Sequence, residues 1–286
     1  MYIDASTTPG GSTVKHQLRA LYDRLRFGFA GRFGGAFGWY YWHFHTPRPG
    51  SLGDLLSTFS RITAPPLTVV QVGANDGLKW DPLHKFIRRD RWQGVLLEPQ
   101  PGVFREWLQP LHARNRRITT VNAALGPADG EMPLYQIGFS TARWATGLAS
   151  FQREQLERVI ESDHVRRQAA KEGVAIPTEP ARRIREERVE VISTDTLFER
   201  YGLRRIDLLF VDTEGFDFEI VKLFDVAARQ PRLVVYENAH LSPDDRTACV
   251  AMLESAGYRV ADLGPNSFAL ARDVDPAPFA RFFTAG

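Results

Sequence analysis

The 286-residue chain has little of several features that define common protein classes. Cys249 is its only cysteine, which excludes a disulfide framework or a cysteine-rich metal site within one chain. The net charge is only +2, so the composition gives no reason to expect nucleic acid as a partner. Near the N-terminus, the longest uncharged stretch (residues 33–45) is too short to cross a bilayer, and no signal-peptide pattern is evident. We therefore expect a cytoplasmic protein.

Hydrophobic residues make up 43% of the chain, and charged residues of balanced sign make up 24%. This composition and length allow a sizeable core and exclude a wholly disordered chain. We expect one large domain over residues 61–286, preceded by an N-terminal extension over residues 1–60.

The extension combines a helical pattern with an aromatic run. In residues 14–27 the apolar side chains recur at helical spacing, with charged side chains largely opposite them. A glycine-rich run with many aromatic residues follows, ending at Phe44. Two interpretations stay open. The segment packs on the main domain as a cap, or residues 14–45 form a lid or a peripheral contact with the inner face of a membrane.

From Leu67 onward, short apolar strands alternate with helices. This pattern is typical of a doubly wound, mostly parallel sheet covered on both faces. The predicted strands are residues 68–72, 94–97, 118–121, 207–211 and 233–236, with a closing pair at 258–262 and 267–272. The predicted helices are residues 82–90, 101–114, 216–229 and 243–256.

Residues 151–190 interrupt this alternation. They contain nine acidic and nine basic residues, a helical first half, and prolines in the second half. The segment shows no apolar strand. We expect an inserted helix and loop over one edge of the sheet, placed to act as a lid.

In an open α/β sheet, ligands bind at the carboxyl ends of the strands. The polar groups at those ends are Gly73-Ala74-Asn75-Asp76-Gly77, Glu98, Asn122, Asp212 and Glu237-Asn238. The glycine turn lacks the spacing of the dinucleotide fingerprint and the lysine of a P-loop. Asn75 and Asp76 suit an ammonium or carboxylate, and Glu98 suits a ribose diol. These features predict a ligand that contains adenosine, and they favour S-adenosylmethionine over NAD.

Several strings resemble the FkbM family of S-adenosylmethionine-dependent methyltransferases. They are VVQVGANDG (69–77), GVLLEPQP (94–101), VNAALG (121–126), TGLASF (146–151), IDLLFVDTEGFDFEIVK (206–222) and VVYENAHLS (234–242). The resemblance covers residues 67–271 and implies a class I, Rossmann-like fold with seven strands, the last antiparallel. It also implies that Gly73, Asn75 and Gly77 contact the methionine part of the cofactor.

By the same resemblance, Glu98 contacts the ribose, and Asn122 and Ala123 lie beside the adenine. We expect Ala74, Asp76, Pro99 and Asp212 to complete the cofactor site. Family members methylate hydroxyl oxygens, so the expected acceptor is a sugar, glycan, glycolipid or natural product.

Methyl transfer to an alcohol requires loss of the hydroxyl proton to a base, or stabilisation of the developing alkoxide by a metal. We expect His240 to be the base, because its pKa lies near the working pH, with Asp212 beside the reacting methyl. Asp212, Glu237 and Asn238 offer oxygen ligands that suit Mg²⁺, so a metal-assisted mechanism remains an alternative. Two rival functions also stay open: an NAD-dependent oxidoreductase, and a non-catalytic module with a degenerate pocket. The sequence leaves the oligomeric state open.

Overall fold

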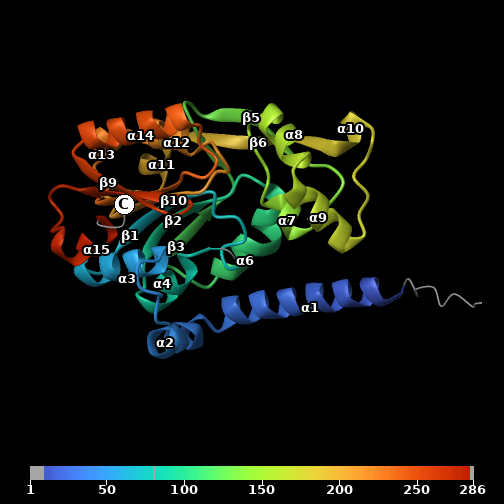
Figure 1. Cartoon of the computed structure of the whole chain (residues 1–286). Coiled ribbons are helices and arrows are strands. Elements are labelled where there is room, and N and C mark those ends of the chain that lie inside the picture. The colour runs from blue at the N-terminus through green and yellow to red at the C-terminus, as the bar shows by residue number, and fades with distance from the viewer. Residues whose placement is uncertain (1–9, 80, 284–286) are drawn as a thin grey trace, which may run out of the picture.

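The computed structural model describes residues 10–79 and 81–283, with side chains from residue 21 onward. Its centre is a seven-stranded sheet in the order β3-β2-β1-β7-β8-β10-β9 (Figure 1). The strands are β1 (Thr68–Val72), β2 (Gln93–Leu97), β3 (Ile118–Val121), β7 (Leu208–Val211), β8 (Leu233–Glu237), β9 (Tyr258–Leu263) and β10 (Asn266–Ala271). The predicted doubly wound, mostly parallel sheet is confirmed, and each of its strands lies within one or two residues of the predicted range.

Strand register brings the ligand-binding ends together. Val72 at the end of β1 pairs with Leu97 of β2 on one side and with Val211 of β7 on the other. The residues that follow these strands therefore meet at one edge of the sheet. Only β10 runs antiparallel to its neighbours β8 and β9. The central strands consist almost entirely of buried apolar residues, as expected of a sheet covered on both faces.

Helices cover both faces of this sheet (Figure 1). One face carries α3 (Leu52–Ile62), α4 (His84–Arg89) and the segment formed by α5 (Pro101–Val103), a π-helical turn (Phe104–Leu108) and α6 (Gln109–His112). The other carries α12 (Asp217–Leu223), α13 (Val226–Arg229) and α14 (Pro243–Ser255). The helix predicted over residues 216–229 is divided in two, because Asp225 adopts a left-handed conformation with φ of 49°. Two short elements, α11 (Thr194–Arg200) and α15 (Ala280–Phe283), complete the domain.

A second sheet corrects the prediction for the insertion. Its three strands are β4 (Ala124–Gly126), β5 (Gly130–Ile137) and β6 (Ile184–Ser193), in the order β4-β6-β5. The expectation that residues 151–190 contain no strand was wrong, since β6 begins inside that range. The rest of the insertion is helical, with α8 (Arg153–Ile160), α9 (Asp163–Glu172) and α10 (Pro180–Arg183), and α7 (Arg143–Thr146) precedes it.

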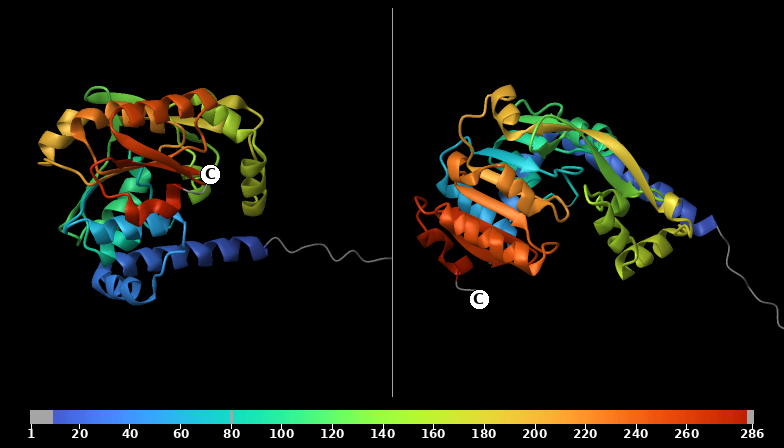
Figure 2. Two further views of the ribbon diagram at one scale, coloured as in Figure 1. Left: turned by 60° about the vertical axis from the view of Figure 1, so that its left-hand side comes forward. Right: turned by 90° about the horizontal axis from the view of Figure 1, so that it is seen from above.

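The N-terminal extension consists of two kinds of helix. The amphipathic helix α3 buries Leu55, Leu56 and Phe59 in the core of the main domain, so it belongs to that domain. In contrast, α1 (Gly10–Arg32) and α2 (Gly34–Phe44) form an outer layer beyond α4 and α6 (Figures 1 and 2). The part of the predicted extension in residues 1–9 lies outside the described residues. Among the helices that the structure describes, none combines the length and apolar character needed to span a bilayer.

Candidate active site

A cavity of about 320 Å³ lies at the carboxyl ends of β1, β2 and β7, where the sequence predicts the ligand. The strands supply its floor, and the segment 143–151 and helix α9 supply further walls. Its polar lining residues are Gln71, Asn75, Asp76, Asp81, Glu98, Gln100, Arg143, Thr146, His164, Gln168, Asp212, Thr213 and Glu214.

The glycine turn after β1 is shaped by contacts that exclude side chains. Gly73 has φ of 85°, and a β-carbon there would overlap with the backbone carbonyl of Asp212. Gly77 also has a positive φ, but a β-carbon there would lie 2.6 Å from Leu108. Gly73 and Ala74 line the cavity, whereas the role of Gly77 is to let the turn pack on the helix below.

Glu98 is buried with 2% of its surface exposed, and it ties the turn to the next strand. Its Oε2 accepts a hydrogen bond of 2.8 Å from the Asn75 backbone N–H, and its Oε1 accepts one of 2.8 Å from Gln100. Burial raises the pKa of Glu98 to about 7. Each carboxylate oxygen has a further lone pair, so the group retains acceptor capacity toward the cavity that it lines.

Asp76 lines the cavity, but protein groups occupy both of its oxygens. Its Oδ1 accepts hydrogen bonds from the backbone N–H groups of Leu78 and Lys79, while Oδ2 pairs with the Arg143 guanidinium. Arg143 also lies 3.7 Å from Asp23 of α1. The side chain of Asp76 therefore stabilises the turn and leaves hydrogen bonding to a ligand to Asn75, which has φ of 47°.

The predicted adenine neighbours lie just outside the cavity wall. Asn122 donates hydrogen bonds to the carbonyls of Glu98 and Pro99, at 2.8 and 3.1 Å, so it fixes the loop after β2. Ala123 is fully buried. The wall at this end is formed instead by Pro99 and by the next two residues, Ala124 and Leu125.

The cavity is rich in carboxylates whose ionised form is disfavoured. Asp81 is enclosed by protein, which raises its pKa to about 7. The pKa of Asp212 is also raised to about 7, by its enclosure and then by the charges of Glu237 and Asp217. A cationic ligand in the cavity would favour the ionised forms of Asp81 and Asp212 and lower their pKa values.

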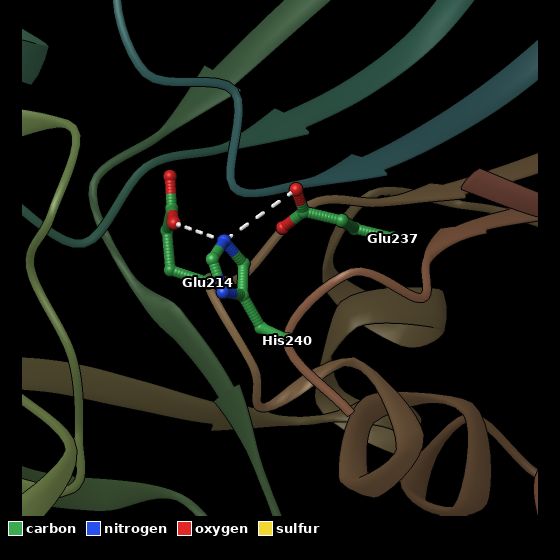
Figure 3. Close-up of side chains that lie close together, drawn as sticks. All are labelled: Glu214, Glu237 and His240. Atoms are coloured by element: carbon green, nitrogen blue, oxygen red, sulfur yellow. Dashed lines mark ion pairs between the residues drawn. The ribbon is translucent and has the colours of Figure 1, made fainter. Parts of the chain in front are cut away.

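A second group of acidic residues, Glu214 and Glu237, lies around His240 (Figure 3). The His240 Nε2 lies 3.4 Å from Oε2 of Glu214 and 3.7 Å from Oε1 of Glu237. Burial and the neighbouring carboxylates raise the pKa of Glu214 to about 9, and that of Glu237 to about 7. The single ligand atoms of these three residues lie within 4.8 Å of one another, close enough to share a proton or an ion.

Asp217 holds this group in place. Its side chain is fully buried, and Oδ2 accepts hydrogen bonds from the Thr213 N–H and hydroxyl and from the Gly215 N–H. Its Oδ1 accepts a bond of 3.1 Å from the Glu237 N–H. One carboxylate thus fixes both the turn that carries Glu214 and the end of the strand that carries Glu237.

The sequence suggested Asn238 as a metal ligand, but its side chain is directed to other partners. It is buried, and its amide donates to the Ser267 hydroxyl at 2.7 Å and to Asp262 at 3.2 Å. Its backbone carbonyl accepts a hydrogen bond from Arg246. The structure thus brings Glu214 and His240 to Glu237, while the Asn238 amide bonds to β9 and β10.

Sequence reasoning missed several residues of the cavity. Asp81 follows a loop with no strand pattern, and Gln100, Arg143, His164 and Gln168 reach the cavity through tertiary packing. Gln155 of α8 donates a hydrogen bond of 2.6 Å to the Glu214 carbonyl, so the insertion supports the acidic group. Only the string 146–151 gave a signal, because it is part of the FkbM resemblance.

The fold and the cavity together are those of the class I methyltransferases. The antiparallel strand between β8 and β9, the close-packed glycine turn and the buried carboxylate after β2 all fit this class. A family model described as the methyltransferase FkbM domain matches residues 71–260. The chain belongs to the FkbM methyltransferase family, and its resemblance to that family is confirmed.

Known structures and sequences add the following findings. The crystal structure of methyltransferase FkbM from Methylobacillus flagellatus KT is similar with a TM-score of 0.45 and 14% identity, over 80% of this chain and 49% of that one. This chain therefore spans about half the length of that protein. The cofactor-bound structure of Rv0187 from MTB has a TM-score of 0.39 and 14% identity, over 94% of this chain and 100% of that one. None of the curated proteins matches the chain.

Proposed function

We propose that the protein transfers a methyl group from S-adenosylmethionine to a hydroxyl oxygen of a sugar, glycan, glycolipid or natural-product acceptor. The observation that carries this proposal is the group formed by Glu214, Glu237 and His240 beside Asp212, at the rim of the cofactor cavity. An alcohol requires a base next to the reacting atoms, and this group supplies one.

The cavity residues suit the cofactor. Bound S-adenosylmethionine supplies an electrophilic methyl group on a sulfonium centre. Glu98 retains lone pairs for the ribose hydroxyls, and Gly73 lines the cavity without a side chain that would occupy it. The negative charge of Asp81 and Asp212 favours a ligand that carries a sulfonium and an ammonium group.

His240 would accept the acceptor's hydroxyl proton at Nε2, while the bound cofactor would supply the methyl group. A positive charge on the His240 imidazole would favour ionisation of the two flanking glutamates, because each presents an oxygen within 4 Å of Nε2. Glu237 is held by Asp217 through its backbone N–H, which keeps the pair aligned. Asp212 lies beside this group and lines the cavity.

A divalent cation is the second means of stabilising the developing alkoxide. The same group of residues could also bind Mg²⁺ in this role. The Asn238 amide is engaged by Ser267 and Asp262, so the ligands on offer are Glu214, Glu237 and His240. Two carboxylates with completing waters suit Mg²⁺. A chelator abolishes transfer if the ion is required and leaves it unchanged if His240 acts alone.

The test measures methyl transfer from labelled S-adenosylmethionine to a panel of methyl glycosides, and S-adenosylhomocysteine binding by calorimetry. His240→Ala and Glu214→Gln should each lower the turnover by about 10²–10⁴-fold while the binding constant stays within about twofold. A variant of the exposed Glu254 (Glu254→Gln) is the matched control. Transfer to nitrogen instead of oxygen would contradict the proposal, as would full activity in His240→Ala.

The family match favours methyl transfer over the oxidoreductase alternative. The non-catalytic alternative is tested by Asp212→Ala and Glu237→Ala. These two variants should lose turnover, whereas a binding module would keep its biological activity in both.

A further inference from the structure

One surface of the molecule is unusually apolar. It is formed by α1 and α2, and we name it the aromatic face after its exposed members. They are Leu21, Tyr22, Leu25, Phe29, Phe33, Trp39, Tyr40, Trp42 and Phe44. Within the described part of the chain, Ile62 is the one other large hydrophobic residue with comparable exposure. Trp42 is 69% exposed and Leu25 is 64% exposed, values ordinary for charged residues but not for tryptophan and leucine.

The opposite side of the same two helices is packed firmly on the domain. Phe27 and Ala30 are buried against Leu78 and Leu111. A β-carbon at Gly31 would lie 3.0 Å from the Pro110 carbonyl, and one at Gly38 would lie 2.7 Å from that of Arg88. These close approaches fix α1 on α6 and α2 on α4. The outward direction of the aromatic face therefore follows from well-packed contacts on its inner side.

The sequence spacing concentrates the exposed residues on one stripe. Leu21, Leu25 and Phe29 recur every four residues along α1, so they follow one another along one side of the helix, and Phe33 continues this spacing just after α1 ends. The stripe continues into α2 through ring contacts, since Phe29 lies 4.6 Å from Phe33 and 5.7 Å from Phe37 between ring centroids. These ring contacts join the apolar residues of α1 to those of α2, and the two helices form the outer layer in Figures 1 and 2.

The charge of this segment differs in sign from that of the remaining chain. Residues 10–48 contain six lysines and arginines and a single acidic residue, Asp23. All other residues together contain 30 basic and 33 acidic side chains. Arg24, Arg26 and Arg32 are exposed among the aromatic residues. An apolar strip flanked by cations complements an anionic surface and repels a second copy of itself.

We propose that the aromatic face binds the surface of an anionic lipid bilayer, with α1 and α2 lying in the plane of the interface. Tryptophan and tyrosine side chains are favoured at the level of the lipid headgroups, where an apolar ring and a polar group are both satisfied. Arginines beside them pair with anionic headgroups. Helices that present aromatic and basic side chains to a bilayer lie in its interface, and among the described helices none could span the bilayer.

The face is joined to the cofactor site through Arg143. This guanidinium stacks on the rings of Phe27 and Trp107, at 4.7 and 5.1 Å from their centroids, and pairs with Asp23 of α1. It also pairs with Asp76 in the cofactor turn. Arg143 thus links the inner side of α1 to the cavity wall, and this connection favours a glycolipid among the acceptors of the proposed function. Lipid binding itself does not depend on that function.

The test uses flotation of the full chain with vesicles of phosphatidylcholine, with and without about 30% phosphatidylglycerol, at two salt concentrations. The wild-type protein should float with the anionic vesicles, and less so at high salt. The double variant Trp42→Ser/Phe44→Ser should bind at least tenfold more weakly, because two large rings no longer enter the interface. Arg26→Glu/Arg32→Glu should lose the preference for anionic vesicles.

The control variants are Ile62→Ser and Arg158→Glu, which change exposed residues outside the aromatic face and should bind like the wild type. Circular dichroism and S-adenosylhomocysteine titration, run on every variant, separate loss of lipid binding from loss of the fold or of cofactor binding. Three results would overturn the proposal: no flotation of the wild-type protein, equal flotation of the Trp42→Ser/Phe44→Ser variant, or concentration-dependent dimers that this variant abolishes.

Discussion

Replacing Glu98 by glutamine should remove a pH dependence that the native carboxylate imposes on cofactor binding. Burial raises the pKa of Glu98 from 4.5 to about 7, and the ionised form is the better acceptor for ribose hydroxyls. Below pH 7, ligand binding must therefore release a proton. We expect the dissociation constant of S-adenosylhomocysteine for the wild-type protein to rise as the pH falls, by about tenfold per pH unit once the pH is well below 7. The total rise from pH 8 to pH 5.5 should be roughly thirtyfold.

The glutamine side chain does not titrate, so in Glu98→Gln the dissociation constant should lose this dependence on pH. At pH 8 the variant should bind about 10–100-fold more weakly, because charge-assisted hydrogen bonds of about 1.5–3 kcal/mol are lost. Near pH 5.5 the two proteins should bind almost equally. Calorimetric titrations at four pH values measure both quantities.

The same substitution predicts a change in stability of definite sign. A carboxyl group whose pKa is raised on folding binds more protons in the folded state, so its contribution to the free energy of unfolding falls as the pH rises from 4.5 to about 7. For Glu98 the fall is about 3 kcal/mol, since each pKa unit corresponds to about 1.4 kcal/mol. Urea unfolding across this range should show the fall in the wild type and in the Glu254→Gln control, and a smaller fall in Glu98→Gln. Equal slopes in wild type and Glu98→Gln, in binding and in unfolding, would refute the reasoning.

Three further substitutions test the turn, the acidic group and the core. Gly73→Ala should lower the free energy of unfolding by about 2 kcal/mol or more and abolish S-adenosylhomocysteine binding, because φ is 85° and the new β-carbon overlaps with the Asp212 carbonyl; unchanged calorimetric binding would contradict this. Asp217→Asn should lower the free energy of unfolding, measured with urea, by about 3 kcal/mol, since one of its two acceptor positions becomes a donor facing N–H groups. An unchanged urea midpoint would show that these bonds contribute nothing. Trp92→Ala should cost about 3–5 kcal/mol, as this fully buried ring stacks on Phe86 at 5.4 Å, yet cofactor affinity should stay the same.

The main sheet was predictable because its strands are short and almost wholly apolar. Thr68–Val72 is followed by the turn-forming Gly73, and Leu208–Val211 is followed by the charged Asp212. This pattern has few structural alternatives, since both faces of a parallel sheet are covered.

The second sheet was not predictable in the same way. β6 (Ile184–Ser193) has buried residues separated by glutamates and arginines that face solvent, and its charges make it look like the helices before it. Its partner β5 starts at Gly130, with exposed residues at its beginning. A strand of this kind is specified by the strands beside it and only weakly by its own composition.

The residues at the cofactor end of the site could be predicted from the ends of the strands. The contact between Glu214 and His240 at the acidic end could not. Gly73, Glu98 and Asp212 follow directly after strands, so their approach is dictated by register. Glu214 reaches His240 only because the turn after β7 is folded back by Asp217, whose hydrogen bonds involve β8 as well. No local pattern encodes a contact of this kind.

The position of β1 has a consequence for how the protein is made. Its partners in the sheet are β2, which follows soon after it, and β7, which lies more than a hundred residues further along the chain. During synthesis β1, β2 and β3 emerge first, and one edge of β1 stays unpaired until Leu208–Val211 has left the ribosome. That edge belongs to the sequence Thr-Val-Val-Gln-Val, which is well suited to pairing with foreign strands. We therefore expect the nascent chain to depend on chaperones during this interval, and fragments that end before residue 208 to aggregate.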